Sequence, residues 1–324
     1  MQDITIRRLD ATHAEAVVSC FQRVYGGTYA NDTFNEPTLL AEAMAAGRVR
    51  SVGALSGDTV LAHMAMNLAV RDAVYAELGN TVVDPDARGG GLAWQVGGEL
   101  TQWCREIGHT GFLHYPTTDH HIMQAQSVKS GFEVGLMLGY VPAETDGQVA
   151  DTRKRLRSAA TIVFEPIDEP QQTLPAMLPS HYANLCRELA ELCGIPRAWQ
   201  PSRRPSFSET IAFLDQNPRR GLARLHVQQA GEHLPSVIDA LTSTQQPCLQ
   251  IDIALSEAGV DEAVEAARTE SFVFCGWLPG YRRSDVLRLQ RVREDVTDLN
   301  PNVVNPGGQR FRALIASALG GSVR

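Results

Sequence analysis

The sequence lacks several features that would place it in a common class of protein. None of its six cysteines belongs to a C-x-x-C pair, and they occur singly in apolar stretches. This is typical of reduced core residues in a cytoplasmic protein. No apolar run approaches the roughly 20 residues that a membrane-spanning helix needs, and the first residues do not have the pattern of a signal peptide. We therefore predict a cytoplasmic protein without a membrane partner.

The sequence also has fewer basic than acidic residues. Lys and Arg number 29 against 37 Asp and Glu, which gives a formal net charge of −8. A general nucleic-acid-binding protein has a basic patch or a high pI, so we expect no nucleic-acid partner. The basic run from Thr152 to Arg157 is flanked by acidic chain and is predicted to be a solvated loop. The net negative charge is compatible with a cationic amine substrate through long-range attraction.

Length and pattern predict two domains of the α/β class. The chain has 324 residues, with the hydrophobic content (44%) and charged content (20%) of a globular protein. Strand and helix patterns alternate in both halves. We predict a first domain over residues 1–166, a proline-rich linker over 167–179 and a second domain over 180–324.

The stretch from Glu77 to Ala93 reads as a strand, a turn containing proline, three consecutive glycines and the start of a helix. Glycines before a helix N-terminus let the backbone N–H groups approach a phosphate, and the helix dipole favours negative charge. A P-loop would need a Lys that is absent here. A Rossmann fingerprint that begins at Gly89 would need Gly or Ala where Trp94 stands.

The pattern that fits is R/Q-x-x-G-x-G/A, satisfied by Arg88, Gly91 and Ala93. With the preceding Val82 to Pro85, it resembles the acyl-CoA-binding motif of the GNAT superfamily of N-acyltransferases. The element order expected for the first half, β-α-α-β-β-β-α-β-α-β, is that of the same family, and Lys129 to Phe132 resembles its second motif. The resemblance implies a mixed, twisted sheet with helices on both faces. Two central parallel strands would splay apart and admit the cofactor between them.

The resemblance also implies a cofactor and the residues that hold it. Acetyl-CoA, or another acyl-CoA, would be the co-substrate. Val82 and Val83 would pair through their backbone with the pantetheine arm. The pyrophosphate would be bound by the residues that follow, namely Arg88, Gly89, Gly90, Gly91, Leu92 and Ala93. We expect no metal, because the adjacent His120 and His121 have neither metal-ligand spacing nor a visible third ligand.

Three residues are candidates for the catalytic proton transfers. Glu77 lies on the strand where many GNAT enzymes carry a general base. The general acid of the family is usually a Tyr, and Ser127 stands at that position here. His120 replaces an Asn common near the start of the same helix, and an imidazole titrates in the range that such a step needs. His63 and Asp119 are weaker candidates.

The second half resembles a degenerate repeat of the first. Lys129 to Leu136 parallels Thr269 to Leu278, since in both a helix leads into a strand that begins with Phe and contains a glycine. The glycine cradle is not repeated, because the loop between Gln228 and Glu232 contains only Gly231. We predict a GNAT-like second domain without a cofactor site. It would close the acceptor cleft or form the contact of a homodimer.

The predicted function is that of an N-acetyltransferase acting on a primary amine of a small molecule. The amine would attack the acyl thioester directly, without a covalent acyl-enzyme. Three alternatives stay open from the sequence: a non-catalytic acyl-CoA sensor, a protein acyltransferase acting on Lys or an N-terminus, and an acyl-carrier protein as the donor.

Overall fold

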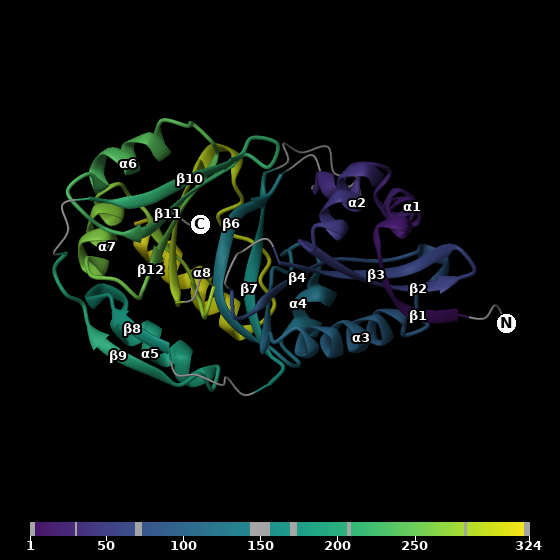
Figure 1. Cartoon of the computed structure of the whole chain (residues 1–324). Coiled ribbons are helices and arrows are strands. Elements are labelled where there is room, and N and C mark those ends of the chain that lie inside the picture. Colours follow the sequence, from purple (N-terminus) through teal and green to yellow (C-terminus); the bar gives the residue numbers. More distant parts are fainter. Residues whose placement is uncertain are drawn as a thin grey trace. The chain divides into compact units, whose positions relative to one another are not determined.

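The computed structural model describes residues 4–29, 31–68, 73–142, 156–168, 174–205, 209–281 and 284–320. These residues form two compact units (Figure 1), the first containing the residues up to His114 and the second those from Tyr115 onward. The domain limits 1–166, 167–179 and 180–324 stay a prediction, and the compact units divide the chain at a different place. Among the described residues, no helix has the length and apolar content to cross a membrane.

A mixed sheet forms the first unit, with strand order β1-β2-β3-β4-β5. Neighbours from β1 to β4 are antiparallel, whereas β5 runs parallel to β4. The predicted mixed sheet with a parallel pair of strands is therefore present. The strands are β1 (Ile4–Leu9), β2 (Val49–Ser56), β3 (Thr59–Asn67), β4 (Ala76–Val83) and β5 (Gly111–His114).

Helices cover both faces of this sheet. Figure 1 places α1 (Ala14–Tyr25) and α2 (Pro37–Ala45) on one face and α3 (Leu92–Glu106) on the other. Helix α1 buries Val17, Cys20 and Phe21, which recur at helical spacing and face the sheet. The helix ends at Gly26, whose φ of 59° is a left-handed conformation that glycine adopts readily.

The second unit has a sheet with strand order β7-β6-β13-β14-β12-β11-β10. Strands β6 (Phe132–Val141) and β13 (Val273–Leu278) meet at the pair Gly135 and Gly276. Gly135 leaves no room for a side chain, because a Cβ there would collide with the backbone of Cys275 and Gly276. The other strands are β7 (Ser158–Pro166), β10 (Ile211–Asn217), β11 (Leu222–Gln229), β12 (Cys248–Ala254) and β14 (Val286–Val292).

The two halves of the chain share an order of elements. In the first unit, α3 joins the parallel strands β4 and β5. In the second unit, α6 (Leu234–Thr242) joins the parallel strands β11 and β12. Helix α7 (Val260–Thr269) then leads into the antiparallel pair β13–β14, just as α4 (His121–Ser127) leads into β6–β7. The remaining helices of the second unit are α5 (Ala183–Leu192) and α8 (Pro306–Ala318).

Three strands were not predicted. Strand β8 (Leu174–Leu178) lies in the predicted linker and pairs in parallel with β9 (Arg197–Pro201), where a loop was expected. The prolines in both segments made them look like loops. Strand β10 lies at an edge and is largely exposed, so it lacks the apolar alternation that marks a half-buried strand. The other expected helices and strands are present, with ends shifted by a few residues.

The prediction of a solvated basic loop is wrong at Arg157. This residue is buried, and its Nε donates to the carbonyl of Gly139 at 2.9 Å. Another of its N–H groups donates to the carbonyl of Arg220. A guanidinium can be buried in this way because it has several donors to place. Residues 151–155 of the basic run lie outside the described residues.

Candidate functional site

The turn between β4 and α3 is fixed by Asp84. Its backbone N–H donates to the carbonyl of Leu61 at 2.8 Å, and its Oδ1 accepts from the N–H of Asp86 at 3.1 Å. Its Oδ2 accepts from Nε of Arg23 on α1 at 2.5 Å. This hydrogen bond to Arg23 holds the pKa of Asp84 below its ordinary value of 3.8, so the carboxylate stays charged at neutral pH. The turn that precedes the glycines is therefore attached to both the sheet and α1.

The glycines that follow form an open cradle. Gly89 and Gly91 have φ values of 84° and 72°, and a Cβ built on either would meet nothing within 4 Å. Gly91 is the N-cap of α3 and has no side chain to cover the helix end. The first backbone N–H of this helix to find a partner is that of Trp94, which donates to the carbonyl of Gly91 at 3.1 Å.

The backbone N–H groups from Gly89 to Ala93 have no acceptor among the residues that the structure describes. Unsatisfied N–H groups at a helix N-terminus, together with the helix dipole, attract an anion. Arg88 is exposed beside them. Of its side-chain nitrogens, only Nε has an acceptor among the described residues, the carbonyl of Val83 at 3.4 Å. The predicted cofactor-binding residues Arg88 to Ala93 thus form one continuous segment whose geometry fits a phosphate group.

Strands β4 and β5 pair over only part of their length. The pairing joins Ala76, Glu77 and Leu78 to residues Phe112 to His114 of β5, whereas β4 continues to Val83. Beyond Leu78, β4 therefore has no partner from β5, and no other strand among the described residues of the first unit pairs with this edge. Val82 and Val83 lie in this stretch and pair on their other side with β3. An extended chain such as a pantetheine arm could add to this edge as a further strand does.

A bulge interrupts β4 at the start of this open stretch. The β3–β4 register shifts so that Asn80 and Thr81 lie opposite the single residue Met64. Asn80 has a φ of 52°, a left-handed conformation that Asn tolerates better than most residues. The sequence signal was the dipeptide Gly79-Asn80 inside an apolar strand, which sequence reasoning did not use.

A buried polar network holds the bulge in place. The Oδ1 of Asn80 accepts hydrogen bonds from the hydroxyl of Tyr29 and from Nδ2 of Asn31, each at 3.1 Å. The carbonyl of Asn80 bonds with Nδ1 of His63 at 2.9 Å, and Nε2 of His63 bonds with the hydroxyl of Ser51 at 2.9 Å. The loop after α1 is thereby connected to β4.

His63 is neutral and its tautomer is determined by its partners. Burial lowers the pKa of His63 to about 4, despite the opposing hydrogen bond with the carbonyl of Asn80. A carbonyl can only accept, so Nδ1 carries the hydrogen and Nε2 accepts from the hydroxyl of Ser51. His63, a weaker candidate from the sequence, is a structural support of the bulge.

Glu77, the candidate general base, lies on β4 before the bulge. It is half-buried, and its Oε1 accepts from Nδ2 of Asn67 at 3.4 Å. Along an extended strand, the three residues from Glu77 to Asn80 span about 10 Å. The role of Glu77 stays a prediction.

The other two catalytic candidates belong to the second unit. His120 is exposed at the N-cap of α4, and its carbonyl accepts from the N–H of Gln124 at 3.1 Å. Ser127 is buried, and its hydroxyl donates to the carbonyl of Met123 in the same helix at 2.7 Å. This bond engages the hydroxyl proton of Ser127 within the helix. Both assignments stay predictions, and the geometry gives Ser127 the weaker support.

The corresponding loop of the second unit has a different form. It connects β11 to α6 and contains Gly231, where a Cβ would collide with the carbonyl of Glu209. The N–H of Gly231 donates to Oγ1 of Thr210 at 3.0 Å, and Nε2 of Gln229 donates to the carbonyl of Glu209 at 3.0 Å. The segment that contains Glu209 and Thr210 covers this loop, whereas Gly89 and Gly91 face open space.

The sequence matches no family model and no curated protein. Solved structures do resemble it. One is the ribosomal-protein-S18-alanine N-acetyltransferase of Escherichia coli, at 19% identity and a TM-score of 0.41 over 53% of this chain and 99% of that one. Another is a GNAT superfamily phosphinothricin acetyltransferase of Sinorhizobium meliloti in complex with acetyl-CoA, at 17% identity and a TM-score of 0.41 over 53% and 91%.

A third is the PaiA N-acetyltransferase of Thermoplasma acidophilum in complex with coenzyme A. It is 16% identical, with a TM-score of 0.37 over 51% of this chain and 99% of the other. These likenesses cover about half of this chain and nearly the whole of each solved structure.

Proposed function

We propose that the protein is an acyl-CoA-dependent N-acyltransferase, most simply an acetyltransferase, that acts on a primary amine of a small molecule. The observation that carries the proposal is the cradle. From Gly89 to Ala93, a run of backbone N–H groups lacks acceptors among the described residues and opens onto free space at a helix N-terminus. This arrangement suits the pyrophosphate of an acyl-CoA, and the open edge of β4 suits its pantetheine arm.

The reaction makes one bond and breaks one bond. The amine nitrogen attacks the thioester carbonyl carbon, the C–N bond forms, the C–S bond breaks, and the thiolate leaves as coenzyme A. The amine must lose a proton, which Glu77 would accept through a water molecule. The thiolate must gain a proton from solvent or from an acid. Of the two candidate acids we favour His120, because the Ser127 hydroxyl is engaged in its helix.

The bulge in β4 would position the thioester. Its backbone is held by the Asn80 hydrogen bonds, so the N–H groups around it are oriented before any ligand arrives. Donors oriented in advance stabilise the charge that develops on a carbonyl oxygen during acyl transfer. The same network ties Tyr29 and Asn31 to the strand, which would couple the loop on the acceptor side to the donor site.

The second half is, in this proposal, a degenerate copy without a cofactor site. Its β11–α6–β12 order supports the copy, and the covered loop at Gly231 supports the loss. Its role in closing the acceptor cleft, or in forming a homodimer, stays a proposal.

Calorimetric titration with acetyl-CoA tests the donor site. Arg88→Glu places a negative charge beside the cradle and should lower the affinity by more than tenfold, which is about 1.4 kcal/mol. Arg48→Glu makes the same charge change at another exposed arginine and should leave the affinity unchanged. Equal affinities of the two variants would show that the cradle is not the acyl-CoA site.

Release of free thiol in the presence of a panel of small amines tests the reaction. Glu77→Gln should lower kcat by about 10²- to 10⁴-fold with little change in acetyl-CoA affinity. The matched control is Glu42→Gln, an exposed carboxylate on α2. Binding of acetyl-CoA without turnover by any amine would favour the sensor alternative. Acyl transfer to proteins alone would favour the protein acyltransferase.

A further inference from the structure

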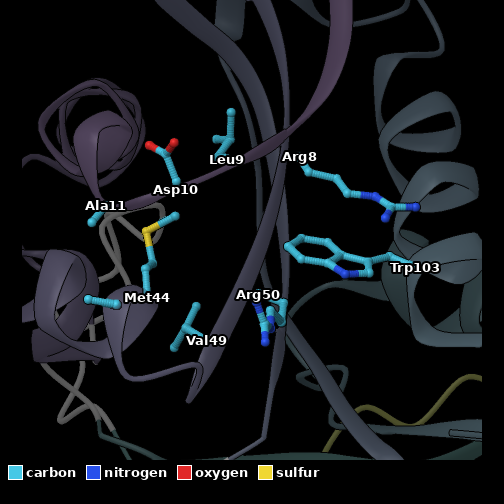
Figure 2. A pocket seen from close by; sticks show the side chains of 9 residues that line it. Arg8, Leu9, Asp10, Ala11, Met44, Val49, Arg50 and Trp103 are labelled. Atoms are coloured by element: carbon cyan, nitrogen blue, oxygen red, sulfur yellow. The ribbon is translucent and has the colours of Figure 1, made fainter. Parts of the chain in front are cut away.

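A separate pocket of about 370 Å³ lies at the end of β1 and the start of β2 in the first unit. Figure 2 shows it between the end of α2, which contributes Met44, and α3, which contributes Trp103. Its apolar surface comes from the buried side chains of Leu9, Met44 and Val49. None of these residues belongs to the glycine cradle or to the bulge network.

The charge of Arg8, which also lines the pocket, is already neutralised. Its Nε donates to Glu99 at 2.7 Å, and its terminal nitrogens donate to both oxygens of Glu106 at 2.6 and 2.9 Å. Arg8 additionally lies over the ring of Trp103, with its Cζ 5.0 Å from the ring centroid. Two carboxylates and an aromatic face therefore satisfy this guanidinium.

Arg50 has no carboxylate partner among the described residues. It lies near the same ring, with its Cζ 5.3 Å from the centroid of Trp103, and it is half-buried. Its Nε is buried and has no hydrogen-bond partner among the residues that the structure describes. No carboxylate of those residues forms an ion pair with it. A guanidinium that is partly removed from water without an anion is unfavourable unless a ligand supplies one.

We propose that this pocket binds a small organic monocarboxylate whose apolar body contacts Leu9, Met44 and Val49 and whose carboxylate pairs with Arg50. A planar guanidinium offers parallel N–H donors that match the two carboxylate oxygens. The apolar surface of the pocket suits a short aliphatic chain or a phenyl ring.

The charges around the pocket favour a monoanion over a phosphate. Asp10 lines the pocket and is kept ionised by hydrogen bonds from the hydroxyl and N–H of Thr12 and from His13. With Arg8 neutralised by its own carboxylates, Arg50 is the one cation without a carboxylate among the described residues that line the pocket, and Asp10 would repel a second negative charge. The site is independent of the proposed acyl transfer, so it can be tested whether or not the protein is an enzyme.

Isothermal titration with benzoate tests the proposal, with benzamide as the neutral control of equal shape and phenyl phosphate as the dianion. Benzoate should bind the full-length protein at least tenfold more tightly than either. Arg50→Gln should weaken benzoate binding at least tenfold, Arg50→Lys should weaken it less, and Arg48→Gln should leave it unchanged. Arg48 is the matched control because it is exposed and is not part of the pocket.

A second measurement does not depend on the stability of a variant. In a ¹⁵N spectrum of the wild-type protein, the Nε–H resonance of Arg50 should shift on addition of benzoate and not on addition of benzamide. The proposal is wrong if benzoate does not bind, if Arg50→Gln binds it as the wild type does, or if the Arg50 Nε resonance does not respond. Tighter binding of phenyl phosphate than of benzoate would overturn the choice of a monocarboxylate.

Discussion

Acidification should destabilise the first unit through His63. The imidazole is buried between the carbonyl of Asn80 and the hydroxyl of Ser51, and burial lowers its pKa from 6.5 to about 4. Above pH 6.5 the ring is neutral in both the folded and the unfolded chain. Between pH 6.5 and 4 only the unfolded chain takes up the proton, so the free energy of unfolding falls as the pH falls through this window.

The size of this loss in unfolding free energy follows from the pKa shift of His63. A difference of about 2.5 pKa units at about 1.36 kcal/mol per unit gives a loss of about 3 kcal/mol by pH 4. This is a large fraction of the 5–15 kcal/mol by which a domain is usually stable. The loss of stability should affect the bulge, because the neutral ring of His63 donates to Asn80 and accepts from Ser51.

Urea unfolding between pH 7 and pH 4, comparing the wild type with His63→Gln, measures this contribution. The difference in the free energy of unfolding between the two proteins should shrink by about 3 kcal/mol over the window. Burial also lowers the pKa of His114 to about 4, but that residue titrates alike in both proteins and cancels in the difference. In the wild type, NMR should show no titration of the His63 ring above pH 5.

A difference in the free energy of unfolding between the wild type and His63→Gln that does not change with pH would refute this account. So would an NMR titration of His63 near pH 6.5, which would mean that the ring is accessible to water and that its hydrogen bonds do not hold the bulge.

Three further predictions follow from the contacts. Gly91→Val should lower the affinity for acetyl-CoA, measured by calorimetric titration, at least tenfold, because φ is 72° at this position and a branched side chain would lie in the cradle. The control Gly98→Ala, in the same helix, should leave the affinity unchanged because a Cβ there has free space. Asp252→Asn should lower the free energy of unfolding, measured with urea, by about 3–5 kcal/mol. The substitution removes the carboxylate that accepts hydrogen bonds from the buried Arg288 at 2.6 and 2.8 Å in the wild type. A loss under about 1 kcal/mol would contradict this prediction. Burial raises the pKa of Glu133 above 4.5, so ionisation of this carboxyl lowers the free energy of unfolding as the pH rises through the pKa of the folded state. Glu133→Gln should therefore gain stability relative to the wild type from pH 4 to pH 7. A difference in unfolding free energy between the two proteins that stays constant over this range would contradict the prediction.

The local elements were predictable because their causes are local. The cradle from Arg88 to Ala93 depends on glycines next to a helix start, and both the left-handed backbone and the exposed N–H groups follow from that short segment. Strands β8 and β9 were missed for the opposite reason. Their pairing joins segments that are separated in the sequence and contain prolines, and neither segment has a distinctive pattern by itself.

The sequence by itself determined the class of fold, the position of the cradle and the likeness between the two halves, because apolar periodicity and glycine placement are properties of neighbouring residues. Only the tertiary structure decided what surrounds them. It attached Tyr29, Asn31 and His63 to the bulge at Asn80 and engaged the Ser127 hydroxyl in its own helix. It also left Arg50 beside Trp103 with no anionic partner among the residues that the structure describes. These outcomes depend on which distant side chains share a buried space, and hydrogen-bond satisfaction in that space is settled only when the chain is folded.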